Sequence, residues 1–121
     1  MAGRDEFVGH VLELLAPLGP VVARRMFGGH GLYHDGLFFG IVHGSVLYLK
    51  VDKTNRPRFE TAGCERFTYS RRGKAAALNF YRAPEEAMDA SQRMLPWARG
   101  ALAAALRARA ARTKNQAPFG A

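Results

Sequence analysis

The stretch Gly28–Val51, GGHGLYHDGLFFGIVHGSVLYLKV, decides the fold because short apolar runs alternate in it with residues of tight turns. Asp35-Gly36 is a strong signal for a two-residue hairpin, and His43-Gly44-Ser45 marks a second tight connection. The runs between these turns repeat with a period of two, which is typical of β-strands. We therefore predict antiparallel strands that are joined by local hairpins.

The wider pattern predicts one helix, four strands, a second helix, two more strands and a final helix. Apolar side chains recur at helical spacing before Pro17, and the period changes to two after it. Strands are expected over Val21–Phe27, Leu32–His34, Leu37–Val42, Val46–Val51, Phe67–Tyr69 and Ala75–Arg82, and helices over residues 6–15, Asp52–Gly63 and from Pro84 onward. Local hairpins with the helices on one face predict an α+β fold with an antiparallel sheet. Pro96 is expected to mark a break in the last helix, or a fresh start after Asp89 or Ser91.

Length and composition predict one domain. The chain has 121 residues, of which 48% are hydrophobic, and its formal net charge is +8. We expect a domain over residues 1–112 and a flexible basic and polar tail over residues 113–121. The single cysteine, Cys64, excludes an internal disulfide and a zinc cluster of thiolates. No apolar run reaches the roughly 18–20 residues that span a bilayer, so we expect a cytoplasmic protein without a membrane contact.

Few residues could carry catalysis. Cys64 lies beside Glu65, whose charge would raise the pKa of the thiol. His30, His34 and His43 could approach one another, but turn histidines are usually solvated, and metal binding would need acceptors behind the rings. We therefore predict no catalytic residue, no cofactor and no metal.

The glycine run Gly28–Gly31 resembles a phosphate-binding loop only superficially. It lacks the strand–loop–helix context and the Lys-Ser/Thr ending of such a loop. We expect these glycines to allow a positive φ or a close approach of strands. A small-ligand or enzyme pocket near Gly28–His34 remains the weakest alternative.

The basic residues form two local patches that could contact nucleic acid. One is the tip of the hairpin between the last two strands, and the other is the end of the last helix, where no acid occurs after Asp89. Solvated turns and the helix dipole explain both patches as well. The candidate nucleic-acid contacts are Arg71, Arg72, Lys74, Arg107, Arg109, Arg112 and Lys114.

Aromatic residues predict an apolar outer face of the sheet. Phe38 and Phe39 are adjacent and point to opposite faces, so one belongs to the core and the other to the outer face. Tyr48 and Tyr81 are expected to share that outer face. An apolar face of this kind would need cover, which suggests a homodimer or a protein partner.

Four runs of sequence together resemble the N-terminal domain of the TfoX/Sxy competence regulators. They are Arg25-Met26-Phe27-Gly28-Gly29, Gly31-Leu32-Tyr33, Leu37-Phe38-Phe39-Gly40 and Leu47-Tyr48-Leu49-Lys50-Val51-Asp52. The resemblance spans about Phe7 to Arg107 and implies an α+β domain similar to type III secretion chaperones, a fold that commonly dimerises. It also implies a stand-alone domain, because the chain ends where the separate C-terminal domain of these regulators would begin.

The resemblance further implies a non-enzymatic regulator of DNA uptake, with a transcription factor or RNA polymerase as partner. It supplies no established contact residues, so the candidate partner contacts are Phe27, Gly28, Gly29, Tyr48, Lys50 and Tyr81. Our leading hypothesis is thus a dimeric regulatory or adaptor domain that acts through protein contacts, with DNA as a further partner. The alternative is a sequence-nonspecific nucleic-acid-binding protein.

Overall fold

The structure is a computed structural model that describes residues 2–26, 28–71 and 73–116, with side chains described for residues 6–26, 28–70, 73, 75 and 77–112. Its elements, including two short 3₁₀ helices η1 and η2, are α1 (Ala2–Leu15), η1 (Ala16–Leu18), β1 (Val22–Met26), β2 (Gly29–His34), β3 (Leu37–His43), β4 (Val46–Lys50), α2 (Arg56–Thr61), β5 (Arg66–Arg71), β6 (Lys74–Arg82), η2 (Glu85–Met88) and α3 (Ser91–Gln116). The predicted order of helices and strands and the α+β class are confirmed.

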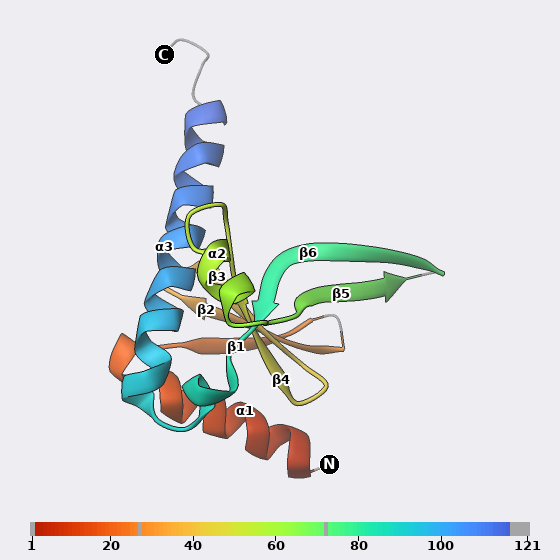
Figure 1. Ribbon diagram of the computed structural model, residues 1–121, viewed down its shortest axis with the longest axis vertical. Helices are drawn as coiled ribbons and strands as arrows, with labels where there is room; N and C mark the ends of the chain where they lie inside the picture. Colours follow the sequence, from red (N-terminus) through yellow and green to blue (C-terminus); the bar gives the residue numbers. More distant parts are fainter. Residues whose placement is uncertain (1, 27, 72, 117–121) are drawn as a thin grey trace.

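The strands form one antiparallel sheet in the order β1-β2-β3-β4-β6-β5. Asp35 and Gly36 have φ values of 50° and 77°, as the predicted two-residue hairpin requires. Gly44 and Ser45 have φ values of 58° and 59° in the turn between β3 and β4. The helices α1 and α3 lie on one face of the sheet, with α3 packed across β3 and β4 (Figure 1).

The hairpin of β5 and β6 is bent and projects from the body of the fold (Figure 1). Its register shifts between Arg66, which pairs with Tyr81, and Thr68, which pairs with Ala77. The extra residues of β6 form a bulge, and the Arg66 guanidinium donates from Nε to the Leu78 carbonyl at 2.9 Å. Because a bulge bends a strand and increases its twist, it explains why the hairpin leaves the plane of the sheet.

The glycines between β1 and β3 have the structural role predicted for them. Gly28 has a φ of 75°, which favours glycine. At Gly29, a Cβ atom would lie only 2.1 Å from the backbone oxygen of Val42. Strands β2 and β3 therefore approach more closely here than a side chain would permit.

The main core lies between the sheet and the helices. It is built from Val11, Leu14, Leu15, Leu32, Phe39, Leu47, Leu49, Phe59, Tyr81, Met94, Ala98, Ala101 and Ala105, with others around them. Helix α3 begins at Ser91, one of the starts that the sequence indicates, and continues through Pro96. Its backbone remains helical to Gln116, beyond the boundary expected at Arg112. The alanines on the buried side of α3 are small, which lets the helix lie close to the sheet.

Tyr81 is where the predicted outer face is wrong. Phe38 and Phe39 do separate, with Phe39 in the main core and Phe38 on the outer face. Tyr81, however, pairs with Leu49 rather than with Tyr48, so it points to the side of the helices. Its ring lies 6.0 Å from that of Phe59, and its hydroxyl donates to Glu60 at 3.1 Å.

We predict that Gly29→Ala destabilises the fold by about 1–3 kcal/mol, because the new methyl group would overlap the Val42 carbonyl within the β2–β3 pairing. Gly9→Ala is the control, since an added Cβ in α1 would have nothing within 4 Å. Alanine should favour that helix by about 0.5–1 kcal/mol. In urea unfolding the two midpoints should move in opposite directions, and a wild-type midpoint for Gly29→Ala would contradict the close approach.

Candidate functional site

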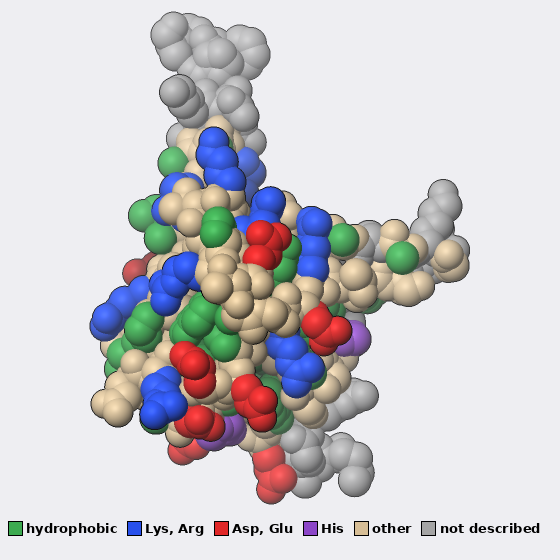
Figure 2. Space-filling view, viewed as in Figure 1, with side chains coloured by type: hydrophobic (Ala, Val, Ile, Leu, Met, Phe, Trp, Pro, Cys, Tyr) green, Lys and Arg blue, Asp and Glu red, His purple; other side chains and the backbone are tan. Residues whose placement is uncertain are grey.

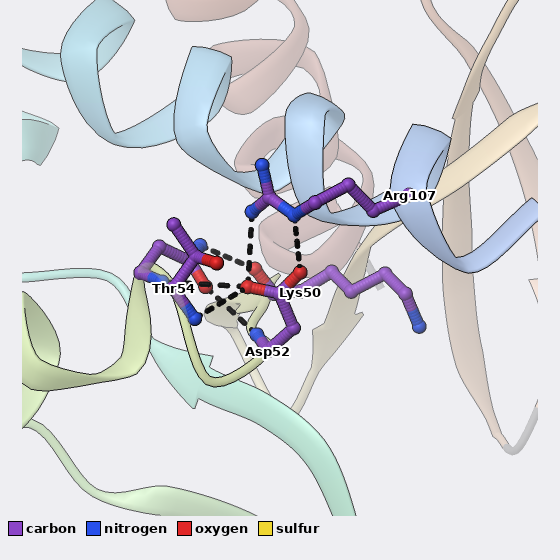
Figure 3. A network of polar contacts seen from close by, with 5 residues as sticks. Lys50, Asp52, Thr54 and Arg107 are labelled. Atoms are coloured by element: carbon purple, nitrogen blue, oxygen red, sulfur yellow. Dashed lines mark hydrogen bonds and ion pairs between the residues drawn. The ribbon is translucent and has the colours of Figure 1, made fainter. Parts of the chain in front are cut away.

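A bidentate ion pair joins the end of β4 to α3 (Figure 3). The Arg107 guanidinium donates from Nε to Asp52 Oδ2 at 2.6 Å and from Nη2 to Asp52 Oδ1 at 2.9 Å. The same carboxylate accepts the backbone amides of Thr54 at 3.0 Å and Asn55 at 3.4 Å. Asp52 therefore holds the turn that leads into α2 and ties this turn to α3. We call this arrangement the Asp52–Arg107 clamp.

Asn55 completes the clamp from inside the protein. Its side chain is buried, and its Oδ1 accepts the Asp52 amide at 2.8 Å while its Nδ2 donates to the Lys50 carbonyl at 3.0 Å. The turn after β4 is thus closed by side-chain hydrogen bonds on both sides. The Lys50-Val51-Asp52 run, which the sequence offered as a partner contact, has this structural role at Asp52.

The charges of the clamp support each other. The hydrogen bond from Arg107 lowers the pKa of the Asp52 carboxyl below its usual value, with the Thr54 and Asn55 amides acting in the same direction against burial. The same bond raises the pKa of Arg107. Arg107 is thus engaged within the protein, although the sequence presents it as a candidate contact for nucleic acid.

The opposite face of the sheet, away from α1 and α3, carries a row of aromatic rings that is contacted by two cations, Arg24 at the sheet edge and Lys50 on β4, between β3 and β6. We call this side the outer face. Arg24 lies 5.2 Å from the Tyr33 ring centroid, and Tyr33 stacks on Phe38 at 5.1 Å. Phe38 in turn lies 5.1 Å from Phe80, and Lys50 Nζ is 5.1 Å from the Phe80 ring. The row therefore runs across strands β1, β2, β3, β6 and β4.

A second group of rings adjoins this row around Phe67. The Phe67 ring is 4.7 Å from Tyr48, 5.6 Å from His43 and 6.5 Å from Tyr69. Phe67, Phe80 and Ile41 are buried on this face by their own neighbours, among which are the partly buried Phe38, Tyr48, Tyr69 and Leu78. Val22, at the sheet edge, is 53% exposed. The outer face is thus a small apolar layer whose accessible side chains include aromatic rings, Val22 and the cationic Arg24 and Lys50.

The outer face is also electropositive. The six strands contain no Asp or Glu, whereas Arg24, Lys50 and Arg82 are among their basic residues. Arg82 faces Glu65 at 3.8 Å, but within the described side chains neither Arg24 nor Lys50 forms an ion pair. Burial and the charge of Arg112 lower the pKa of Lys50, against the opposite effect of Asp52.

The predicted nucleic-acid contacts fall at separate places. Arg109 and Arg112 are exposed on the projecting end of α3, where Lys and Arg side chains are prominent (Figure 2). Arg71 and Lys74 belong to the strands of the β5–β6 hairpin, but their side chains lie outside the described residues, as does that of Lys114. Arg72 and Phe27 lie wholly outside them. The end of α3 and the β5–β6 hairpin are therefore separate parts of the surface (Figure 1), and Arg107 is bound to Asp52 in the clamp.

The predicted partner contacts also divide. Tyr48 and Lys50 lie on the outer face, Gly28 is exposed in the turn between β1 and β2, and Gly29 packs against β3. Sequence reasoning missed Arg24 and Tyr33 as members of the outer face. The alternation of side chains along each strand indicated which residues share a face. Placing Arg24 beside Tyr33 also required the register between β1 and β2, which the sequence does not give.

The groups that could carry chemistry have other roles. His34 Nδ1 is hydrogen-bonded to the Pro20 carbonyl at 2.7 Å, and His43 packs on Phe67. Among the described residues there is no cluster of three metal-ligating side chains. Burial raises the pKa of the Cys64 thiol, which disfavours the nucleophilic thiolate. None of the described helices has the length and apolar character needed to cross a membrane.

We predict that Asp52→Asn lowers the free energy of unfolding at neutral pH by about 1 kcal/mol, a value reduced to allow for the solvent exposure of Arg107. The pKa of Asp52 is lower in the folded than in the unfolded protein. Its contribution is thus complete above the unfolded value of about 3.9 and is lost as the pH falls through the folded value. Denaturant unfolding should therefore show the gap between wild type and variant narrowing in acid.

The control for the clamp is Asp35→Asn, which removes the same charge from a side chain that is 82% exposed. It should change stability by less than about 0.5 kcal/mol. A gap for Asp52→Asn that stays constant as the pH falls would mean that the ionised carboxylate is not what stabilises the turn.

The sequence is similar to a known protein family and to two curated proteins. The sequence model of the TfoX N-terminal domain family matches residues 13–105 of this chain. The chain is 36% identical over 64 residues to the DNA transformation protein TfoX1 of Aliivibrio fischeri, which covers 53% of this chain and 31% of that protein. It is 27% identical over 104 residues to the protein Sxy of Escherichia coli, which covers 86% of this chain and 50% of that protein. The chain thus spans half or less of these curated relatives, and it belongs to the TfoX N-terminal domain family.

Proposed function

We propose that this protein is a non-enzymatic regulatory or adaptor domain that acts on DNA uptake by binding other proteins. Its family membership supports this proposal, because one relative is named a DNA transformation protein. The clamp, the hydrogen-bonded His34 and the neutral Cys64 thiol account structurally for the residues that might otherwise suggest an enzyme. We assign the activity to the cytoplasm and to a domain over residues 1–112.

The observation that carries the proposal is the outer face. Apolar surface that is not packed against another element commonly marks a site of protein interaction. Here Val22, Tyr33, Phe38 and Tyr48 leave part of their apolar surface accessible, on the side of the sheet away from α1 and α3 (Figure 1). The partners that we consider are a transcription factor, RNA polymerase and, in a homodimer, a second copy of this chain.

We predict that deleting the gene from its host lowers natural transformation and the transcripts of DNA-uptake genes. The wild-type gene should restore both, whereas Tyr48→Ser should not, because it removes an aromatic ring from the outer face. Arg99→Ala, an exposed change on α3, should restore both and serves as the control. Circular dichroism would verify that each variant folds. Unchanged transcripts and transformation after the deletion would reject the proposed role.

The second candidate function is sequence-nonspecific binding of duplex DNA, and the end of α3 favours it. No acid follows Asp89 in the sequence, and the exposed Arg109 and Arg112 lie where α3 projects beyond the sheet (Figure 1). A one-signed segment of this kind attracts phosphates without reading sequence. The hairpin tip with Arg71, Arg72 and Lys74 is the other proposed contact.

We predict for this candidate that the affinity for labelled duplex DNA falls with salt, with a log–log slope near −0.9 for each phosphate neutralised. The double variant Arg109→Ala/Arg112→Ala should reduce the steepness of that slope by about 1.8. Arg93→Ala is the control, because Arg93 lies near the other end of α3, 4.0 Å from Asp89. Fluorescence anisotropy at several salt concentrations measures the slopes. An absence of binding at low salt would eliminate the DNA function.

A further inference from the structure

We propose that the outer face binds an acidic segment of a partner protein that also carries apolar or aromatic side chains. The inference rests on the proposed function and specifies the chemistry of the partner. It follows from three properties of this face: its uncompensated positive charge, the orientation of its rings, and its mismatch with a second copy of itself.

The positive charge lacks an internal partner. Arg24 and Lys50 both contact the aromatic row, and each lies over a ring rather than against a carboxylate. The nearest acid to Lys50 in the sequence is Asp52, but its carboxylate already accepts two bonds from Arg107. In Figure 3, Lys50 extends away from the clamp. A carboxylate supplied from outside would therefore meet Arg24 or Lys50 without competing with an existing ion pair.

The apolar part of the face favours protein side chains over nucleobases. A base stacks on the face of an aromatic ring. The faces of the Tyr33 ring are occupied, because Arg24 approaches from β1 and Phe38 stacks from β3, and these strands flank β2 on its two sides. A ring held in this way presents its edge outward, and ring edges carry positive partial charge. Carboxylates and the faces of other aromatic side chains are suitable partners for such edges.

A second copy of the chain fits the face poorly. In a two-fold symmetric contact the same patch lies on both sides of the interface. Arg24 and Lys50 would then meet the same strands again, and none of the six strands contains Asp or Glu. An acidic partner would bring carboxylates to Arg24 and Lys50, whereas a second copy would bring the same cationic side chains.

The test uses a fluorescein-labelled random copolymer of glutamate and tyrosine, which combines acidic and aromatic side chains. Wild-type protein should bind it more tightly than it binds polyglutamate, and much more tightly than a lysine–tyrosine copolymer. The double variant Arg24→Gln/Lys50→Gln should weaken binding at least about tenfold, which corresponds to roughly 1.4 kcal/mol. Arg93→Gln/Arg99→Gln, with the same loss of net charge on α3, should bind as the wild type does.

Backbone NMR of the wild-type chain gives a readout that does not depend on how the variants fold. Addition of the glutamate–tyrosine copolymer should shift the amide signals around Tyr33, Phe38 and Tyr48 and leave those around Arg93 and Arg99 in α3 unchanged. Shifts confined to α3, equal weakening by the two double variants, or no binding would each overturn the proposal. Tighter binding of an oligothymidylate with shifts on the outer face would overturn it in favour of single-stranded nucleic acid.

Light scattering tests the remaining possibility, which is that a second copy of this chain occupies the outer face. A stable dimer in which Tyr33→Ser restores the monomer mass would overturn the proposal in favour of a second copy on this face. The deletion experiment stays independent of these results. If the copolymer binds the outer face but deletion leaves DNA uptake unchanged, the proposed function fails alone. If deletion lowers DNA uptake but the face ignores the copolymer, only the acidic partner is rejected.

Discussion

The carboxylate of Asp52 joins the turn between β4 and α2 to helix α3, which is distant from that turn in the sequence. It follows β4, it accepts the amides of Thr54 and Asn55 at the entrance to α2, and it receives two bonds from Arg107 of α3. Because α3 lies across β3 and β4, the position of this one ion pair relates the longest helix to the centre of the sheet. The apolar contacts of Met94 and the alanines of α3 supply the burial, and the clamp adds a polar contact between α3 and the turn after β4.

Local signals in the sequence were enough to predict the order of elements. Asp35-Gly36 closes a two-residue hairpin because both positions need a positive φ, and Gly29 is required because Val42 lies against it. The misplaced residue, Tyr81, depends on a pairing with Leu49 that joins strands separated by α2 and β5. A shift of one residue in that register moves a side chain to the other face, and no neighbouring turn specifies it. Non-local register is therefore where sequence reasoning ends.

In the candidate site, too, the features that depend on neighbouring residues could be predicted, and those that depend on the order of the strands could not. The sequence indicated an apolar outer face through Tyr48 and through one ring of the Phe38/Phe39 pair. It could not indicate the row from Arg24 to Lys50, because that row crosses five strands and requires their lateral order. Arg107 was equally hidden, since its partner Asp52 is 55 residues away and nothing local distinguishes it from Arg109.

The basic residues that contribute to the net charge of +8 consequently lie in different surroundings. Arg107 forms an ion pair with Asp52 at the surface of the protein. Arg109 and Arg112 place their charges on a helix end that suits a polyanion such as duplex DNA. Arg24 and Lys50 lie over rings of the aromatic row, where a polyanion without apolar groups would not contact the rings. A partner that is acidic and apolar at once would use both features of the outer face, which is why we propose a protein rather than DNA as the ligand of this face.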